Sequence, residues 1–271
     1  MKLKNIIIFI LFVLGVIFSY NYFDSSSQQT NTETIITGET IKVANWNLQI
    51  FGDAKASNEY LMNKYVEIIN DYDIIFVQEI RDIDGSSFDQ LCNMHQLNDY
   101  QCQISNRYGR SFSKEAQGVI FRDGINILEF KQFDQEVETR FERPPIAVTF
   151  ENNGYIFQVW NAHLKPDSVV TELDAFETIV EDKGNVVLIG DFNADGDYYH
   201  PEKNSHFSSW NWVIGDGEDT TVAKSSNAYD RIILNSDMNN ELLNYGIVSE
   251  GITSEISDHY LIFVEISGVG K

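Results

Sequence analysis

The succession of short apolar runs between residues 41 and 266 constrains the fold more than any other feature. The continuous runs DIIFVQE and NVVLIG are typical of buried strands. Helical periodicity separates some of the runs, at residues 57–73, 88–97 and 168–180. Between Gly118 and His163, strand-like runs follow one another without a helix, so they must pair antiparallel. We therefore predict an α/β fold with a mixed sheet, or two sheets packed face to face and covered by outer helices.

The beginning of the chain follows a different pattern. Lys2 and Lys4 precede an unbroken apolar run from Ile6 to Phe18, which is typical of a secretory signal. No clear cleavage site follows, so an uncleaved membrane anchor over residues 5–23 is the alternative. We predict a signal peptide or anchor at 1–23, a polar linker at 24–40 and one folded domain at 41–271. The 43% hydrophobic content of the 271 residues supports a substantial core in that domain.

Export has consequences for location and for the cysteines. The mature protein is expected to be secreted, extracellular or periplasmic, or to be held at a membrane through the N-terminal segment alone. Cys92 and Cys102 are the two cysteines of the chain. In an exported protein they could pair and close a short loop, and the alternative is two buried free thiols. Their spacing matches no zinc site.

The charge balance limits the partners. The chain has 19 Lys+Arg against 41 Asp+Glu, a formal net charge of −22. Such a body repels polyanions at long range, which argues against tight, salt-driven DNA binding. A polyanionic substrate is still compatible, because bound divalent cations can reverse the sign of the charge locally.

Several predicted strands begin or end at a strongly polar residue. These residues are Asn47, Glu79, His163, Asp191, Asn193, Asp230, Asp258 and His259. A single polar residue at a strand end is most often a turn or a cap, and a lone histidine is most often structural. Two histidines, four acids and two asparagines at such positions are harder to explain in that way, because loops at sheet ends are where rigid scaffolds carry their sites.

These residue types suit one chemistry. Carboxylate and amide oxygens are hard ligands for Mg²⁺, Mn²⁺ or Ca²⁺. One histidine can take a proton from water while the other donates one to a leaving alkoxide. A nearby divalent ion stabilises charge on a phosphoryl oxygen. The set therefore indicates metal-assisted phosphodiester hydrolysis.

The motifs resemble, in order, those of the endonuclease/exonuclease/phosphatase superfamily, and most closely those of its deoxyribonuclease I branch. The matching segments are WNLQIFG, DIIFVQEIRD, GRSFSKE, NAHLKPD, LIGDFNAD, DTTVAKSSNAYDRI and ISDHY. The resemblance extends from about Lys42 to Ile266, and it implies a four-layer α/β sandwich. GDFN and SDH are shared by many superfamily members, whereas QEIRD and DTT…AYDRI are more specific to this branch.

The resemblance implies a role for each matching residue. It implies a metal site, Mg²⁺ or Mn²⁺, at Glu79 with Asp191, Asn193, Asp258 and the neighbouring Asn47. It implies a catalytic histidine pair, His163 oriented by Glu115 and His259 oriented by Asp230. Arg81 and Arg143 match arginines that touch DNA. A structural calcium site is partly kept through Asp219, Thr221 and Ser225. Which histidine is the acid and which the base stays open.

Some positions depart from the branch. Ser113, next to Phe112, stands where a tyrosine packs against the minor-groove sugar, and Gln49 replaces an arginine. The usual second disulfide is absent, because Gly196 and Asn227 occupy its positions. We therefore expect DNA to be bound weakly, in a salt-sensitive way and with little sequence specificity, by a monomer.

Three hypotheses follow. The first is a secreted or surface-anchored, divalent-metal-dependent DNA endonuclease. The second is a same-fold phosphodiesterase or phosphatase for a lipid or small phosphoester. A lipid enzyme of this fold would carry an exposed aromatic membrane hairpin, for which SSWNWVIGDG, with Trp210 and Trp212, is the only candidate, but we interpret this segment as an ordinary packed one. The third is an exported calcium-binding or adhesion module, which leaves both histidines, Glu79 and Asp230 unexplained.

The third hypothesis arises from DFNADGDYYHPE, which fits the calcium loop of an EF-hand letter for letter. An EF-hand needs a helix that enters the loop, but NVVLIG predicts a strand. Pro201 is also awkward where a helix would have to follow. We therefore interpret Asp191 and Asn193 as site residues, with Asp195 and Asp197 on a turn beyond them that could hold a structural ion.

Overall fold

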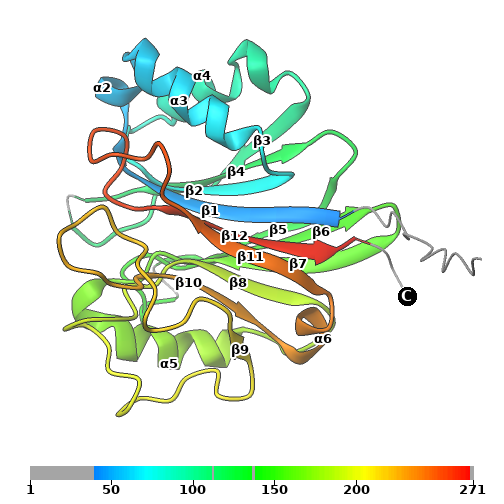
Figure 1. Ribbon diagram of the computed structural model, residues 1–271, viewed down its shortest axis with the longest axis vertical. Helices are drawn as coiled ribbons and strands as arrows, with labels where there is room; N and C mark the ends of the chain where they lie inside the picture. Colours follow the sequence, from blue (N-terminus) through cyan, green and yellow to red (C-terminus); the bar gives the residue numbers. More distant parts are fainter. Residues whose placement is uncertain (1–39, 112, 136–137, 269–271) are drawn as a thin grey trace, which may run out of the picture. The chain divides into compact units, whose positions relative to one another are not determined.

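The computed structural model describes residues 40–268 apart from 112, 136 and 137 (Figure 1). The predicted signal or anchor at 1–23, and the linker as far as residue 39, lie outside these residues. Within the described part of the chain, no helix is both long and apolar enough to cross a bilayer.

The first of two sheets has the strand order β11-β12-β1-β2-β4-β3. Its strands are β1 (Thr40–Phe51), β2 (Ile74–Ile80), β3 (Tyr100–Ile104), β4 (Ala116–Arg122), β11 (Leu242–Val248) and β12 (Leu261–Ser267). The central pair β1–β2 is parallel, and the other pairings are antiparallel.

The second sheet repeats this plan, with the order β5-β6-β7-β8-β10-β9. Its strands are β5 (Asn126–Gln132), β6 (Ile146–Asn152), β7 (Tyr155–Asn161), β8 (Val186–Asp191), β9 (Asn211–Trp212) and β10 (Asp230–Leu234). Again one central pair, β7–β8, is parallel, and its neighbours are antiparallel.

Helices cover the outer face of each sheet, which confirms the predicted four-layer α/β sandwich (Figure 1). On the first sheet lie α2 (Asp53–Ala56), α3 (Glu59–Ile69) and α4 (Ser86–Cys92). On the second lies α5 (Val169–Ile179), while the short α6 (Ser236–Asn239) joins β10 to β11. Two 3₁₀ turns, η1 (His95–Leu97) and η2 (Pro166–Ser168), complete the elements.

The predicted helix at 88–97 is wrong in its bounds. The α-helix begins at Ser86 and ends at Cys92, and Met94 is extended with ψ 134° before η1. By contrast, α3 follows its sequence signals: the Asn58 side chain accepts hydrogen bonds from the first backbone N–H groups, and Leu61, Tyr65 and Ile69 are buried.

Alternation along the strands builds the layers. In β1, Val43 faces the core between the two sheets, while Ala44 and Trp46 face the helices α2–α4. A third apolar cluster, which includes Trp160 and Phe176, lies between the second sheet and α5. Every second residue of the central strands therefore faces the other sheet. At one end of the sandwich these residues are polar.

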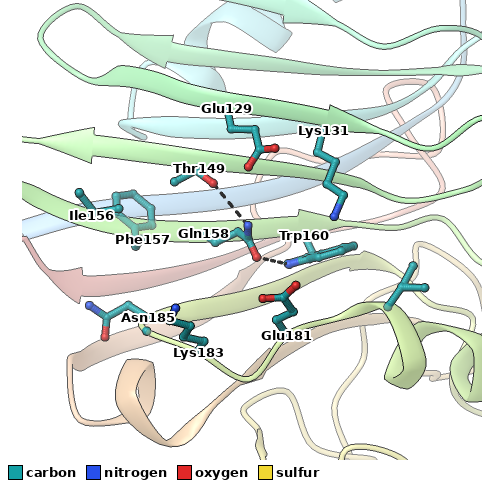
Figure 2. A pocket seen from close by; sticks show the side chains of 12 residues that line it. Glu129, Lys131, Thr149, Ile156, Phe157, Gln158, Trp160, Glu181, Lys183 and Asn185 are labelled. Atoms are coloured by element: carbon teal, nitrogen blue, oxygen red, sulfur yellow. Dashed lines mark hydrogen bonds between the residues drawn. The ribbon is translucent and has the colours of Figure 1, made fainter.

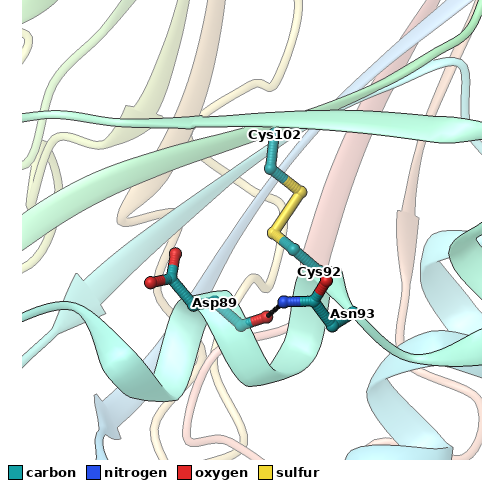
Figure 3. The surroundings of a disulfide bond; sticks show 4 residues. All are labelled: Asp89, Cys92, Asn93 and Cys102. Carbon is teal, nitrogen blue, oxygen red and sulfur yellow. Dashed lines mark hydrogen bonds between the residues drawn. A yellow bond between two sulfur atoms is a disulfide. The ribbon is translucent and has the colours of Figure 1, made fainter.

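A disulfide joins Cys92, at the end of α4, to Cys102 in β3 (Figure 3). Of the two alternatives for these cysteines, the structure shows the paired one. The bond closes a loop with a sequence separation of 10 residues. Closing a loop of this size stabilises a fold by about 2–3 kcal/mol.

Candidate active site

The strand directions bring the predicted site residues together. Parallel strands end at the same edge of a sheet, so Asn47 of β1 lies beside the end of β2, and His163, just after β7, beside Asp191 of β8. Antiparallel neighbours begin at that edge. Asp230, the first residue of β10, therefore pairs directly with Asp191.

His163 and Glu115 form the first histidine–carboxylate pair. His163 Nδ1 lies 2.6 Å from Glu115 Oε1, and both side chains are buried. Burial opposes a charge on the imidazole, but Glu115 and Asp191 outweigh both burial and Arg143, so the pKa of His163 is raised. The carboxylate holds Nδ1 and leaves Nε2 free to face the site.

His259 and Asp230 form the second pair. His259 Nδ1 lies 2.8 Å from Asp230 Oδ2. Burial opposes the charge here too, yet Asp230 and Asp191 raise the pKa of His259 to about 10. The pKa of Asp230 is also raised, because its burial outweighs the attraction of His259.

Both histidines direct their second nitrogen at Asp191. His163 Nε2 lies 3.4 Å, and His259 Nε2 3.5 Å, from Asp191 Oδ2. Burial alone would raise the pKa of this carboxyl, but His259 and His163 lower it below its ordinary value. Two imidazoles held by two carboxylates thus meet at a third carboxylate.

Glu79 and Asn47 lie next to this centre. Asn47 Nδ2 is 3.3 Å from Glu79 Oε1 and 3.1 Å from Asp191 Oδ2, so it bridges the two carboxylates. The backbone N–H of Ile50 donates to Glu79 Oε2 at 2.8 Å. Burial of Glu79 is outweighed by His163, Arg81 and these donors, which lower its pKa and keep it ionised.

The backbone is strained at this end of the strands. Four of the six non-glycine residues with positive φ in the described chain lie here: Gln49, Ile50, Glu79 and Asn193. An L-residue in this region costs about 1–2 kcal/mol, and such strain persists where the surroundings fix it, as at active sites. At Glu79 the positive φ interrupts the alternation of β2.

The remaining predicted ligands differ in exposure. Asn193 is buried, donates through Nδ2 to Leu164 O at 3.0 Å, and donates its N–H to Asp191 Oδ1. Asp258 has a half-exposed side chain, and its Oδ1 is 3.9 Å from His259 Nε2. Glu79 with Glu115 and His163, and Asp191 with Asp230 and His259, each place one possible ligand atom per residue within 4.8 Å of one another. Each group thus combines one predicted ligand, Glu79 or Asp191, with one histidine–carboxylate pair. The carboxylate oxygens of Glu79 and Asp191 are of the kind that a divalent cation prefers.

The two predicted arginines lie on the side of the first pair. Arg81 Nε is 3.8 Å from Glu115 Oε2, and its Nη2 is 3.4 Å from Glu79 Oε2. Arg143 Nη1 is 3.5 Å from Glu115 Oε2, while its Nε donates to His163 O and its Nη2 to Leu164 O. Arg143 is 8% exposed, so its fork also fixes the backbone that carries His163.

Comparison with known proteins decides the family. Residues 44–259 match the Endonuclease/Exonuclease/phosphatase family. The chain belongs to this family. Deoxyribonuclease-1 of Bos taurus is 30% identical over 264 residues, which cover 85% of this chain and 93% of that protein. The Homo sapiens deoxyribonuclease-1 is 31% identical over 260 residues, which cover 83% and 92%.

Solved structures share the fold. A humanized D. rerio TDP2 superposes with a TM-score of 0.64 at 13% identity, over 83% of this chain and 98% of that one. An endonuclease/exonuclease/phosphatase from Bacteroides vulgatus gives 0.61 at 18% identity, over 84% and 98%. The resemblance to the deoxyribonuclease I-like branch is thus confirmed, and the family member described here is a hydrolase of phosphodiester bonds.

The predicted calcium residues of this family member share one loop. Asp219 Oδ1 accepts hydrogen bonds from the N–H and the hydroxyl of Thr221, and that hydroxyl lies 3.2 Å from Ser225 O. Thr221 also forms a β-bridge with His259. The loop therefore lies against the backbone of the second histidine–carboxylate pair.

Sequence reasoning did not single out two residues that support the site. Ser257 Oγ donates to Asn47 O at 2.6 Å and accepts from His259 N at 3.0 Å, so it joins β1 to the SDH motif. Gln78 accepts a hydrogen bond from Asp191 N at 3.1 Å. Both residues belong to motifs of the sequence, SDH and QEIRD. Each is a polar residue next to a predicted site residue, and that position was the signal that could have identified them.

The loop after β8 is not an EF-hand. It is entered by a strand, β8, where an EF-hand requires a helix. Asp195 Oδ2 accepts a hydrogen bond from Ala228 N at 2.7 Å, which ties the loop to the chain before β10.

A separate cavity of about 250 Å³ lies away from the site, beside β5, β6, β7 and the segment that follows α5 (Figure 2). Its lining includes Lys131, Trp160 and Glu181, and none of the predicted site residues. Gln158 bridges Thr149 and Trp160 by hydrogen bonds across this surface.

Proposed function

We propose that the protein is an exported, divalent-metal-dependent endonuclease that hydrolyses DNA phosphodiester bonds by acid–base catalysis with His163 and His259. One observation carries the proposal: both imidazoles, each held by a carboxylate at Nδ1, present Nε2 to the same Asp191 oxygen, at 3.4 and 3.5 Å. The similarity to deoxyribonuclease-1 over 85% of the chain supports DNA as the substrate class.

The paired geometry suits a displacement at phosphorus. One imidazole in its neutral form accepts the proton of the attacking water at Nε2, and the other, protonated, donates from Nε2 to the leaving oxygen. Glu115 and Asp230 hold the Nδ1–H groups and so keep each ring in the required tautomer and orientation.

The oxygen donors beside the histidines are proposed to hold Mg²⁺ or Mn²⁺. Glu79 is proposed as the principal ligand, assisted by Asp191, Asn193 and Asp258, with Asn47 hydrogen-bonded to both Glu79 and Asp191. When bound, the ion stabilises negative charge on the phosphoryl oxygens. Its charge also offsets the net −22 of the chain where the substrate approaches.

Substrate contact is assigned to Arg81 and Arg143. Arg81 is the more accessible of the two, with a side-chain exposure of 22% against 9% for Arg143. Two arginines on an acidic body support weak, salt-sensitive DNA binding, which we propose for a monomer. Calcium at Asp219, Thr221 and Ser225 would stabilise the loop that pairs with His259.

Export is supported by two features. The N-terminal run from Ile6 to Phe18 follows the pattern of a secretory signal. The Cys92–Cys102 disulfide suits an oxidising compartment, since disulfides persist outside the cytosol.

A plasmid-nicking assay tests the proposal. Wild-type protein should nick supercoiled DNA with Mg²⁺ or Mn²⁺ and lose this activity in EDTA. His259→Ala and Glu79→Ala should be inactive, whereas His200→Ala, a half-exposed histidine outside the site, should match the wild type. Metal-independent nicking, or full activity of both site variants, would overturn the proposal.

The net charge and Ser113 favour a second candidate, a phosphodiesterase or phosphatase for a lipid or small phosphoester. The candidate membrane hairpin is instead a packed segment, as expected, because Trp210 and Trp212 lie partly buried against the cluster beneath α5. Sphingomyelin and a small nitrophenyl phosphodiester, assayed in parallel, separate the two. Hydrolysis of either of these without DNA nicking would favour the second candidate.

A further inference from the structure

Directly beneath the catalytic residues, the core between the sheets changes from apolar to amide. Three amide side chains, all 0% exposed, meet there: Asn45 of β1, Gln78 of β2 and Asn161 of β7. The residues two positions earlier on these strands, Val43, Phe76 and Val159, belong to the apolar core between the sheets. The residues two positions after Asn45 and Asn161 are Asn47 and His163 of the site.

The three amides form a closed ring of hydrogen bonds. Asn161 Nδ2 donates to Asn45 Oδ1 at 2.7 Å, Asn45 Nδ2 to Gln78 Oε1 at 3.3 Å, and Gln78 Nε2 to Asn161 Oδ1 at 3.2 Å. Since Asn45 and Gln78 lie in the first sheet and Asn161 in the second, the ring joins the sheets.

Backbone groups fix the direction of the ring. Asn161 Nδ2 also donates to Ile189 O at 2.9 Å, and Gln78 Nε2 to Ala162 O at 2.8 Å, so these nitrogens must face carbonyl oxygens. Gln78 Oε1 accepts from Asp191 N at 3.1 Å. The ring therefore grips the ends of β7 and β8 immediately before His163 and Asp191.

The backbone at this point leaves no room for a side chain at residue 190. Gly190 has φ +153°, and a Cβ there would lie 2.0 Å from Ala162 O and 2.9 Å from Gln78 Nε2. The close approach of β7 and β8 thus places Ala162 O and Asp191 N within reach of one Gln78 side chain.

We infer that the Asn45–Gln78–Asn161 ring is a positioning device, which sets the separation and orientation of His163 and Asp191 relative to Asn47 and Glu79. Apolar residues fill the equivalent positions elsewhere between the sheets, so burial alone does not require amides here. A fully satisfied buried polar network instead specifies one arrangement of the strands that share it. Catalytic groups need such precision, because a displacement of about 1 Å can cost about 10²-fold in rate.

The inference rests on the proposed catalysis at His163, Asp191 and His259, and a matched pair of variants tests it. Gln78→Met removes the acceptor for the N–H of Asp191, the last residue of β8. Asn235→Leu removes the buried acceptor for the N–H of Val186, the first residue of the same strand. Both variants lose a buried amide that accepts a hydrogen bond from a backbone N–H of β8, but only Gln78 is at the site.

We expect both variants to lower the melting temperature and only Gln78→Met to lower kcat, by about 30- to 100-fold with KM within about threefold. Equal kcat for Gln78→Met and wild type, or an equal kcat loss in Asn235→Leu, would overturn the inference. If Gln78→Met does not fold, Asn161→Ala, which breaks the ring from the second sheet, takes its place.

A readout independent of activity separates this test from that of the proposed function. In NMR spectra of metal-free protein, the signals of the carbon-bound imidazole protons of His163 and His259 should shift in Gln78→Met and keep their positions in Asn235→Leu. If wild-type protein fails to nick DNA, the proposed function fails, and the shift comparison still decides whether the ring positions the histidines. Unchanged imidazole signals in Gln78→Met would show that the amide ring does not position the histidines.

Discussion

The two histidine–carboxylate pairs look equivalent, but different charges hold them. In the first pair, Glu115 Oε1 is hydrogen-bonded to His163. Its other oxygen, Oε2, lies 3.5 Å from Arg143 and 3.8 Å from Arg81. Both cations attract the carboxylate, and Arg143 at the same time opposes a proton on His163.

The second pair has no such help within the part of the chain described. The ion-pair partner of Asp230 is His259. Asp230 Oδ1 and Glu115 Oε2 are both buried without a hydrogen bond, but the arginines lie beside Glu115 Oε2. Arg231, the next residue, directs its guanidinium away, toward Ile214 O, Ala194 O and Asp216. The charge of Asp230 is therefore balanced by the proton on His259, whose pKa is raised to about 10.

Because of this difference, we expect the two pairs to contribute similarly to catalysis but differently to the stability of the fold. Removing a member of either pair should damage the reaction similarly, since both rings face Asp191. The cost to stability should differ, because the first carboxylate neutralises buried arginine whereas the second is itself a buried charge that the fold disfavours.

The largest expected effect comes from the histidines. His163→Ala and His259→Ala should each lower kcat by about 10³-fold, as loss of a general acid or base does. Because the two act in one step, the double variant should lose little more than either single one. Single-turnover nicking measures this, and His200→Ala is the control. Independent, multiplicative losses would show that the two histidines do not act in one step.

Removal of the first carboxylate should damage both activity and stability. Glu115→Gln should lower kcat by about 10²-fold through the loss of His163 orientation. It also leaves the 8%-exposed Arg143 without its carboxylate, and breaking a buried pair costs about 3–5 kcal/mol. Urea unfolding beside kcat measures both effects. An unchanged free energy of unfolding would show that Arg143 is satisfied by its two backbone carbonyls alone.

Removal of the second carboxylate should affect activity alone. Asp230→Asn should also lower kcat by about 10²-fold, because His259 loses the partner of Nδ1. Burial raises the pKa of Asp230, so the folded state disfavours its charge, and a neutral amide should change the free energy of unfolding by less than about 1 kcal/mol. If Asp230→Asn lost as much free energy of unfolding as Glu115→Gln, the two carboxylates would not differ in their contribution to stability.

Much of this comparison was predictable from sequence. The buried strand runs, the antiparallel stretch between Gly118 and His163 and the polar strand ends indicated the sandwich and the edge that carries the site. The family resemblance supplied the pairing of each histidine with its carboxylate, and the contacts at 2.6 and 2.8 Å agree with it. The strands β9 and β11 were not predicted. The first has two residues, and β11 is an edge strand with no fully buried residue, so its apolar pattern is weak.

Long-range geometry was beyond the sequence. QEIRD and SDH located Glu79 and His259, but no pattern shows that Gln78 meets Asn45 and Asn161, which are 33 and 83 residues away. The arginines were predicted as substrate contacts. Their contact with Glu115 depends on the start of β4 facing the loop after β7, and that arrangement follows only from the packing of the two sheets.

The pH dependence of stability sharpens the comparison. A histidine whose folded pKa is raised contributes stability that is complete below its unfolded pKa, about 6.5, and lost as pH rises through the folded value. For His259 that window extends to about 10. In EDTA, the free energy of unfolding of wild-type protein should therefore fall from pH 7 to pH 10, and His259→Gln should flatten this slope.

His163→Gln is the matched variant for this experiment. The pKa of His163 is also raised, but Arg143 opposes its proton, so its removal should flatten the slope less. Urea titrations at several pH values measure the three slopes. Equal slopes in wild type and His259→Gln would show that the proton is not held at the second pair.

The smallest effect tests whether the arginines of the first pair also serve the substrate. Arg81→Ala should raise KM for DNA roughly 3- to 10-fold and reduce the slope of log KM against log salt by about one, as loss of one phosphate contact does. Arg122 is the last residue of β4, away from the site, and is paired with Asp73. Arg122→Ala should leave both KM and the salt slope unchanged. If Arg81→Ala keeps the salt slope and lowers kcat instead, its charge serves Glu79 and Glu115 alone. The asymmetry between the two pairs would then be internal to the catalytic machinery, with no part in DNA binding.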